Sequence, residues 1–263
     1  MLPALRVRDF AKPRWPASAL YTGGMATPRS TRNPLFLGRW FQDEVIIVAV
    51  RWYLTYPLSY RQVCEMLRDR GVSVAASTVM RWVLRYAPEF EKRWQRYEKP
   101  VALSWRVDET YIKVAGHWTY LYRAVDQNGK SVDFFLSRRR DVGAAKAFFR
   151  RALKKHGDPL SITLDVYAAS HRAVRELKES GEILYQKMRV PSCAYLNNVV
   201  EQDHRRVKRR VNPMLGFKSF ENARLVIAGI ELAQKISKRQ YDLRRLGGID
   251  ASHAQVWQQV MAA

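Results

Sequence analysis

The feature that most constrains the fold is a change of periodicity at Trp105. Before it, apolar residues recur with helical spacing; after it, β-branched and aromatic runs alternate with helical segments. Strands are expected at residues 105–114, 118–126, 132–137, 160–164 and 183–190. Helices are expected at residues 142–155, 169–179, after Pro191 and at about 220–238. This order predicts a mixed α/β fold, in which helices pack on a five-stranded mixed sheet.

The segment before the sheet predicts an all-α domain of the helix-turn-helix type, residues 35–98. Helical runs are expected at residues 43–56, 60–70 and 78–86, followed by a linker helix at 89–100. Ser59 and Ser77 are expected to cap the second and third helices, and Gly71 to close the second. On the outer face of the last helix, Thr78, Arg81 and Arg85 are expected to contact DNA. The alternative is a purely structural or dimerising bundle.

The remaining parts of the chain are its two ends. Residues 1–34 carry scattered prolines and arginines without a sustained period, and we expect a flexible basic arm. Met25 is an alternative start codon. An extension without a function is an alternative of equal weight to a functional basic arm. Residues 99–240 are expected to form the sheet domain, and residues 241–263 a C-terminal tail.

The charge of the chain points to nucleic acid. Its formal net charge is +22 and its isoelectric point is near 10.3, so a polyanion is the expected partner. A basic protein of membrane surfaces would concentrate its charge on one amphipathic helix, whereas lysine and arginine run through this whole chain. The apolar run 45–50 is too short to span a bilayer, and Cys64 and Cys193 lack metal-ligand spacing. A cytoplasmic protein is expected, nucleoid-associated when on DNA.

Three carboxylates stand where a metal site would need them. Asp108 lies within the first strand, Asp165 follows the fourth strand, and Glu201 lies in a later helix. Oxygen ligands without paired histidines or cysteines favour hard divalent cations, Mg²⁺ above all. Two such ions stabilise the attacking and leaving oxygens of phosphoryl transfer. Each acid also has a structural alternative: a strand-edge salt bridge, a turn cap and a capping box, respectively.

The helix that contains Glu201 combines this acid with cations. Asn198 is a candidate cap, and His204, Arg205 and Lys208 share the face of Glu201 by helical spacing. This face suits a metal site at one end and a phosphate backbone along the rest. The alternative is a capped, solvated basic helix, and for His204 a solvated position is as good a reading as a DNA contact.

Other residues compete for roles at this site. In a strand Glu109 points away from Asp108, so only one of the two is expected to face the metals. Asp203 lies on the far side of its helix from Glu201 and is expected to be solvated or salt-bridged. Three aromatic residues are expected in the core rather than as base-stacking platforms: Trp105, Trp118 and Tyr122.

Several segments together resemble one family over residues 36–240. They are Ser59-Tyr60-Arg61, Trp105-Arg106-Val107-Asp108-Glu109-Thr110-Tyr111, Tyr120-Leu121-Tyr122-Arg123-Ala124-Val125-Asp126, Tyr195-Leu196-Asn197-Asn198, Glu201-Gln202-Asp203-His204 and Leu215-Gly216-Phe217-Lys218-Ser219-Phe220. With them the chain resembles bacterial DDE transposases of insertion sequence family six. The resemblance implies a ribonuclease-H-like catalytic domain, with Asp108, Asp165 and Glu201 as its acidic triad and Lys208 as the basic position of the family.

The resemblance also implies a function. Such a protein binds the terminal inverted repeats of its element and target DNA, and uses two Mg²⁺ ions, or Mn²⁺ in their place, for strand cleavage and strand transfer. A homodimer or larger assembly on DNA is expected. Val166, after the second aspartate, departs from the small or polar residue usual in the family. The alternatives are a catalytically impaired DNA-binding protein derived from a transposase, and a structure-selective nuclease of the same fold.

Overall fold

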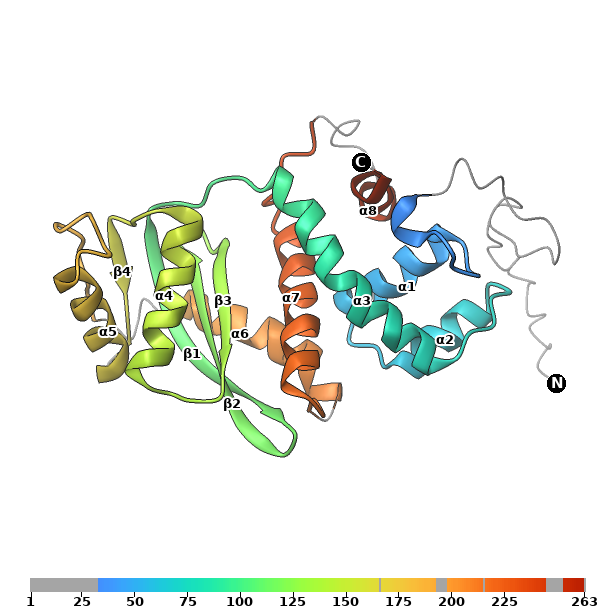
Figure 1. The fold of residues 1–263 in the computed structure, drawn as a ribbon, viewed down its shortest axis with the longest axis horizontal. Helices are drawn as coiled ribbons and strands as arrows, with labels where there is room; N and C mark the ends of the chain where they lie inside the picture. The colour runs from blue at the N-terminus through green and yellow to red at the C-terminus, as the bar shows by residue number, and fades with distance from the viewer. Residues whose placement is uncertain (1–32, 166, 193–197, 215, 245–252, 263) are drawn as a thin grey trace, which may run out of the picture.

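The computed structural model describes residues 33–165, 167–192, 198–214, 216–244 and 253–262. The helices are α1 (Asp43–Thr55), α2 (Tyr60–Arg68), α3 (Ala76–Trp94), α4 (Val142–His156), α5 (Ala168–Glu179), α6 (Asn198–Val211), α7 (Phe220–Ser237) and α8 (His253–Ala262). The strands are β1 (Ser104–Val114), β2 (His117–Asp126), β3 (Ser131–Ser137) and β4 (Ser161–Thr163). The sheet with α4 and α5 forms one end of the molecule, α1, α2, α3 and α8 form the other, and α7 lies between them (Figure 1).

The sheet has the order β3-β2-β1-β4. β1, β2 and β3 are antiparallel neighbours, and β4 runs parallel to β1. Two tight turns join the antiparallel strands. Ala115 and Gly116 both have positive φ, as a two-residue hairpin requires, and the expected turn at 126–129 is confirmed, with Asp126 Oδ1 accepting from the backbone N–H groups of Asn128 and Lys130. The mixed α/β class is thereby confirmed.

The fifth strand expected at 183–190 is not found, and the described sheet has four strands. Within the segment only Arg189 forms a β-bridge, an isolated one to Ser161 of β4. The backbone N–H groups of Leu184 and Tyr185 both donate to Asp158 Oδ2, at 2.6 and 2.8 Å, so they are not available to a ladder. Pro191, which follows, has no N–H to donate. Local side-chain bonding therefore overrides the strand propensity of the segment.

The first two helices before the sheet begin as expected, at Asp43 and Tyr60, and the third does not. The capping box of Ser59 and Gln62 starts α2. α3 begins after Ala75, not after the expected cap Ser77, and continues through Pro88 to Trp94. The third helix and most of the expected linker helix are therefore one. The reason is the apolar stripe beyond the proline, which ends in the fully buried Trp94 and outweighs the cost of a proline inside a helix, about 3 kcal/mol.

The expected C-terminal tail contains α8, which packs on the helical end of the molecule. The ring of Trp257 lies 5.7 Å from that of Phe90 and 5.7 Å from that of Trp94. These contacts bury Trp257 almost completely. Residues 241 to 262 thus close the core of the α1 and α3 region rather than trailing from it, apart from the stretch 245–252 that lies outside the described residues.

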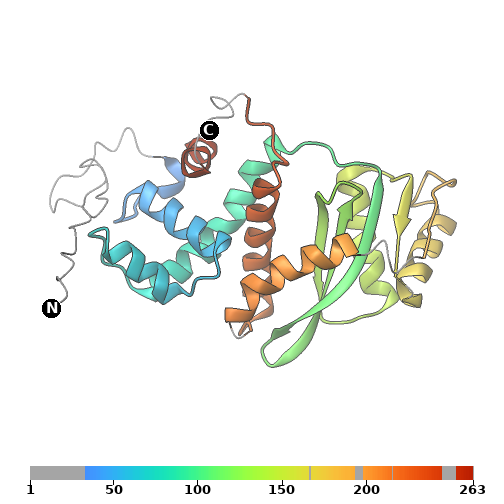
Figure 2. The same ribbon diagram turned by 180° about the vertical axis from the view of Figure 1, so that it is seen from behind.

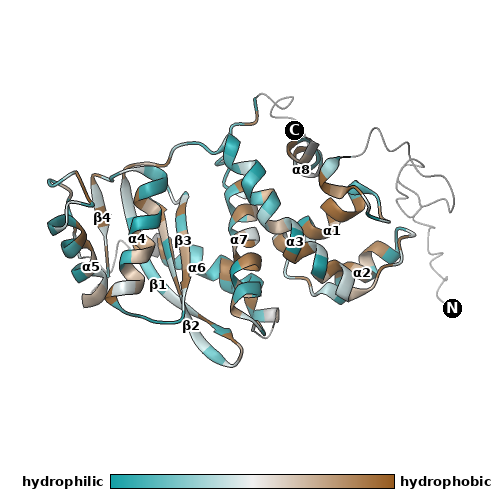
Figure 3. Cartoon of the chain, viewed as in Figure 1, coloured by the Kyte–Doolittle hydropathy of each residue, from teal (hydrophilic) through white to brown (hydrophobic). Residues whose placement is uncertain are grey.

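α7 is shared between the two ends of the molecule. On one side, Gly229 allows it to approach α1 and α3 closely, because a Cβ there would lie 2.6 Å from the side chain of Leu54 and 3.1 Å from that of Ala87. On the other side it supplies ion-pair partners to the sheet half, among them Glu231. Both ribbon views show α7 in this central position (Figures 1 and 2). One apolar core accordingly runs from α1, drawn largely in brown in Figure 3, through α7 to side chains of β1, β2 and β3.

A second core lies between the sheet and the helices α4 and α5. Trp105 and Tyr122 are fully buried there, as expected. Trp118 is 59% exposed, so its expected place in the core is wrong. It lies near the turn of the β1–β2 hairpin, which projects beyond the helices (Figure 2), and its ring packs edge-on against that of Tyr111, 4.9 Å away. Cys64 is buried as expected, and Cys193 lies outside the described residues.

A search of the described helices for a membrane span finds none with the length and apolarity that crossing a bilayer needs.

Candidate active site

Two of the three predicted carboxylates converge at the edge of the sheet. β4 pairs with β1 only from Ser104 to Arg106, so Asp108 lies just beyond the end of β4, where the chain reaches Asp165. Ligand oxygens of Asp108, Glu109 and Asp165 all lie within 4.8 Å of one another. The sequence prediction that Asp108 and Asp165 share a site is therefore supported by their geometry.

Glu109 joins this group although only one of the two neighbouring acids was expected to face it. The two side chains do leave β1 in opposite directions, Asp108 toward α6 and Glu109 toward Ser170 of α5. Because β4 has ended at this point, no strand separates the two sides, and one oxygen of each reaches the neighbourhood of Asp165. The expectation that a single acid of the pair would do so is wrong.

The environment of Glu109 makes its charge unfavourable. Its side chain is buried, and burial together with the nearby Asp165 raises its pKa, against the hydrogen bond from Ser170 and the ion pair with Arg140. Arg140 Nη2 lies 3.2 Å from Glu109 Oε2. A cluster of three acids with one partly exposed arginine has a local excess of negative charge, which a bound cation would relieve.

Asp165 and Arg140 are held by the loop that leads into α5. The backbone N–H of Tyr167 donates to Asp165 Oδ1 at 2.9 Å, which fixes the carboxylate at the start of the loop. The hydroxyl of Tyr167 donates to the backbone carbonyl of Arg140, and the guanidinium of Arg140 stacks 3.8 Å from the centre of the tyrosine ring. Val166, between the two, lies outside the described residues.

Asp108 is approached from the opposite side by His204 of α6. His204 Nε2 lies 3.3 Å from Asp108 Oδ2, without the alignment of a hydrogen bond, and His204 is only 5% exposed. Neither ring nitrogen of His204 has a hydrogen-bond partner in the described structure. The solvated position considered for this histidine is therefore wrong: His204 lies in the site, against the first aspartate.

Glu201 lies on the first turns of α6, exposed, and its carboxylate is not within the group of oxygens that Asp108 and Asp165 form. Glu201 shares the helix face of His204 but precedes it by three residues, so it lies about 4.5 Å nearer the N-terminal end of α6 along the helix axis. The predicted cap Asn198 is the first residue of α6, and its side chain lies outside the described ones, as do Tyr195, Leu196 and Asn197 entirely. The role of Glu201 stays a prediction.

The other predicted contacts lie on exposed faces of helices. Lys208 is half-buried, with its Nζ 5.1 Å from the ring centre of Tyr111, and Arg205 is exposed beside it. On α3, Arg81 and Arg85 are exposed and Thr78 is partly so. None of these DNA contacts is tested by the structure, and each stays a prediction.

Asp203 was expected to be solvated or salt-bridged, and it is salt-bridged in a buried network. Burial alone would raise its pKa, but Arg123 and Lys238 together lower it. Arg123 Nη2 lies 2.7 Å from Asp203 Oδ2, Arg123 Nε lies 2.8 Å from Glu231 Oε1, and Lys238 Nζ lies 2.6 Å from Asp203 Oδ1. This network joins β2, α6 and α7, and so fixes the helix that carries Glu201 and His204.

Sequence reasoning missed three residues around the acids: Arg140, Tyr167 and Ser170. No local pattern marks them, because their place depends on how α5 packs beside β1. A weak signal existed for His204, since it follows Glu201 at helical spacing. Three carboxylates and no sulfur or paired nitrogen are the donor set that Mg²⁺ prefers, so the residues present fit a divalent-cation site.

Comparison with known proteins gives a family, and relatives that match over most of their length. The family described as the DDE domain matches residues 102–240. The transposase for insertion sequence-like element IS431mec of Staphylococcus aureus strain Mu50 is 38% identical over 217 residues, covering 81% of this chain and 93% of the relative. The transposase for insertion sequence element IS257 in transposon Tn4003 of Staphylococcus aureus matches with the same identity and coverage.

Solved structures with some likeness are retroviral integrase cores. The HTLV-2 integrase catalytic core domain in complex with magnesium is 16% identical with a TM-score of 0.39, covering 60% of this chain and 96% of that one. The catalytic core domain of BIV integrase is 18% identical with a TM-score of 0.37, covering 58% and 91%. Because both TM-scores are below 0.5, the description of the fold rests on the strands and helices of this chain alone.

Proposed function

The chain belongs to the DDE transposases of insertion sequence family six, enzymes of the polynucleotidyl transferase class, and on this premise we propose that it cuts and joins DNA with divalent metal at the carboxylate site. The observation that carries the proposal is the convergence of Asp108, Glu109 and Asp165 at the sheet edge. A ribonuclease-H-like core is part of the proposal, supported by the mixed sheet and by the acid that follows its parallel strand.

We propose that Asp108 and Asp165 hold the metal and that Glu201 completes the set from α6. Two Mg²⁺ ions, or Mn²⁺ in their place, would supply Lewis-acid stabilisation of the attacking and leaving oxygens when bound there. His204, buried against Asp108, is proposed to position that carboxylate and not to contact DNA as first expected. Glu109, held by Arg140 and Ser170, keeps the negative charge of the site close to Asp165.

The reaction balances without a covalent protein intermediate. A water oxygen attacks the phosphorus at the end of the element, the P–O3′ bond breaks, and the leaving oxygen takes a proton to become a 3′-hydroxyl. That hydroxyl then attacks a phosphodiester of the target, forms the new P–O bond, loses its proton and releases a target 3′-hydroxyl. Lys208 and Arg205 are proposed to hold phosphates beside this site, which makes binding depend steeply on salt.

We further propose that the helices α2 and α3 act as a helix-turn-helix that reads the terminal inverted repeats through Thr78, Arg81 and Arg85. Their exposure on one helix supports this. Because transposition joins two element ends to one target, a homodimer or larger assembly on DNA is proposed as the active form.

The test is strand cleavage and strand transfer with Mg²⁺, on duplexes that carry the inverted repeats found beside the gene. Wild-type protein is expected to nick the element end and join it to target DNA, and Asp108→Ala and Asp165→Ala to do neither. Glu179→Gln, an exposed acid on α5, is the control and is expected to behave as wild type. Equal products from wild type and Asp108→Ala would overturn the catalytic assignment. Hydrolysis that never yields joined strands would identify a structure-selective nuclease instead.

A further inference from the structure

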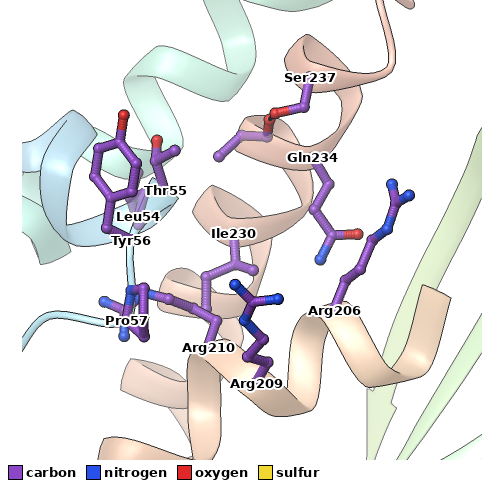
Figure 4. A pocket seen from close by; sticks show the side chains of 11 residues that line it. Leu54, Thr55, Tyr56, Pro57, Arg206, Arg209, Arg210, Ile230, Gln234 and Ser237 are labelled. Atoms are coloured by element: carbon purple, nitrogen blue, oxygen red, sulfur yellow. Dashed lines mark hydrogen bonds between the residues drawn. The ribbon is translucent and has the colours of Figure 1, made fainter. Parts of the chain in front are cut away.

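A pocket of about 200 Å³ lies where the C-terminal end of α1 meets α6 and α7 (Figure 4). It lies outside the carboxylate site, and no residue of that site lines it. Its polar lining comes from all three helices and from the residue after α1, and consists of Thr55, Tyr56, Arg206, Arg209, Arg210, Gln234 and Ser237. None of the residues that line it is acidic.

Arg210 forms the fixed part of this pocket. It is 4% exposed, and its Nε donates to the backbone carbonyl of Tyr53 at 2.6 Å, so it caps the C-terminal end of α1. Its guanidinium lies 4.3 Å from the ring centre of Tyr53. Burial lowers its pKa despite these contacts, and its Nη1 has no hydrogen-bond partner in the described structure. A cation is therefore held in place, with the Nη1 group left without a partner among the described residues.

Arg206 and Arg209 form the open part. Both are exposed, and Figure 4 shows their side chains rising from α6 on the same side, toward Gln234 and Ile230 of α7. Neither forms an ion pair with a described carboxylate, in contrast to most arginines of the sheet half. Asp203, the acid whose charge Arg206 influences, is already bound by Arg123 and Lys238. The positive charge of the pocket is thus not balanced by an ion pair among the residues that the structure describes.

Neutral hydrogen-bonding groups complete the lining. Gln234 accepts from Arg123 with its Oε1, at 3.3 Å, so its amide nitrogen is left as a donor. Thr55 and Ser237 add hydroxyl groups, although the hydroxyl of Ser237 already donates to Ala233 O at 3.1 Å. Guanidinium groups with neutral donors and no carboxylate are the chemistry that recognises a phosphate, because planar arginine forks match its oxygens.

We propose that this pocket binds a phosphate of the DNA backbone, on the side of α6 turned toward the helical half of the molecule. The inference rests on the proposed function, since it takes DNA as the ligand of the chain. Arg209 follows Glu201 by eight residues, so it lies about 12 Å further along α6 and about 80° around it. One strand of a duplex carries a phosphate about every 3.4 Å of its axis, so a duplex lying along α6 would bring to the pocket a phosphate three to four nucleotides from the one at Glu201.

The test compares Arg206→Gln/Arg209→Gln with Arg172→Gln/Arg175→Gln. Both variants remove two exposed arginines from one helix face, and the second pair is on α5, far from the pocket. Binding of each to a 30-base-pair duplex of arbitrary sequence is measured by fluorescence anisotropy over a series of salt concentrations. The pocket variant is expected to bind about tenfold more weakly, with a salt slope smaller by about two, and the α5 variant to stay near wild type.

A second measurement locates the phosphate. Neutral methylphosphonate links are placed one at a time on both strands of a duplex with an element end. One position outside the cut is expected to weaken binding to wild type and to have no further effect on Arg206→Gln/Arg209→Gln. Equal affinities and slopes for the two double variants, or the same methylphosphonate profile with and without the pocket arginines, would overturn the proposal.

Two further outcomes are distinguished in the same experiments. If the pocket variant loses only the thermal stabilisation that inorganic phosphate gives wild type, and binds DNA unchanged, the pocket is a free-anion site and the DNA proposal is wrong. If Asp108→Asn abolishes strand cleavage while the pocket variant binds as wild type, the pocket fails and the proposed function stands. If wild type neither binds nor cuts DNA, the proposed function itself fails.

Discussion

Helix α6 carries charge in two different ways on two of its sides. On one side Asp203 is buried between Arg123 and Lys238, and Glu231 completes a network in which two cations meet two anions. On another side Arg206 and its neighbours line an open pocket without an acid. The first arrangement is neutral and closed, and the second is positive and open, although both lie within two turns of one helix.

This difference between the two sides of α6 distinguishes charges that stabilise the fold from charges that are available to a ligand. A buried charge is tolerated when its partners are within the protein, so the Arg123 network needs nothing from outside. Among the described residues the pocket arginines have no acidic partner, and the three acids at the sheet edge share only the partly exposed Arg140, so positive charge is left over in the first place and negative charge in the second. A nucleic-acid backbone is the ligand that would neutralise the arginines, and divalent cations are the ligands that would neutralise the acids.

The largest effect is expected at the open acidic site. Asp108→Asn removes a charge that a divalent cation requires, which removes several kcal/mol of transition-state stabilisation and slows strand cleavage at least about 1000-fold. Single-turnover cleavage of an element-end duplex measures it. Asp69→Asn, the same change at the exposed end of α2, is the control. Retained cleavage in Asp108→Asn would remove the acidic site from the comparison.

The next largest effect is expected in the closed network. Arg123→Ala leaves Asp203 and Glu231 buried without their shared cation, and should lower the free energy of unfolding by about 3–5 kcal/mol. Urea denaturation at pH 7 measures the change. Arg151→Ala, which breaks a partly exposed pair with Asp133, serves as the milder comparison. A loss below about 1 kcal/mol for Arg123→Ala would mean that the network does not hold the fold.

A smaller effect is expected at His156, a histidine close to the lysine pair Lys155 and Lys235. Burial, then these two lysines, lower its pKa to about 4. Between that value and about 6.5 the unfolded chain binds a proton that the folded chain does not, so stability falls as the pH drops through this window. Partial exposure limits the contribution to about 1–2 kcal/mol. Denaturation curves from pH 7 to pH 4 should fall less steeply for His156→Gln than for wild type; parallel curves would contradict the shift.

The smallest effect on stability is expected in the open pocket. Arg206→Gln/Arg209→Gln removes charges that have no partner in the described protein, so the free energy of unfolding should change by less than about 0.5 kcal/mol, or rise slightly. Thermal and urea denaturation without DNA measure it. A loss comparable to that of Arg123→Ala would show that the pocket arginines belong to the closed class after all.

Much of the fold was predictable because local patterns and tertiary packing agree. The capping box of Ser59 and the apolar spacing of α7 mark helices that the structure contains. Asp108 and Asp165 were predictable as a pair, since an acid in or directly after a buried strand has few structural uses. In these places the signal comes from residues within one helix or strand, and a sequence pattern describes one such element at a time.

The rest depends on where elements end and meet. Glu109 joins the acids because β4 stops three residues short of its level, which alternation along β1 does not reveal. α3 crosses Pro88 because α7 and α8 cover its far half, and Trp118 is exposed because its hairpin outruns the helices. The charge pocket is of the same kind, since its walls come from segments about 150 residues apart along the chain.

The central position of α7 has a consequence for how the chain is made. The ribosome completes the synthesis of α1 and α3 well before it reaches Phe220, the first residue of the helix that covers their apolar faces. At typical rates of synthesis the wait is on the order of ten seconds. During that interval the nascent chain exposes an apolar surface. We therefore expect it to need a holding chaperone, and we expect fragments from interrupted translation to aggregate.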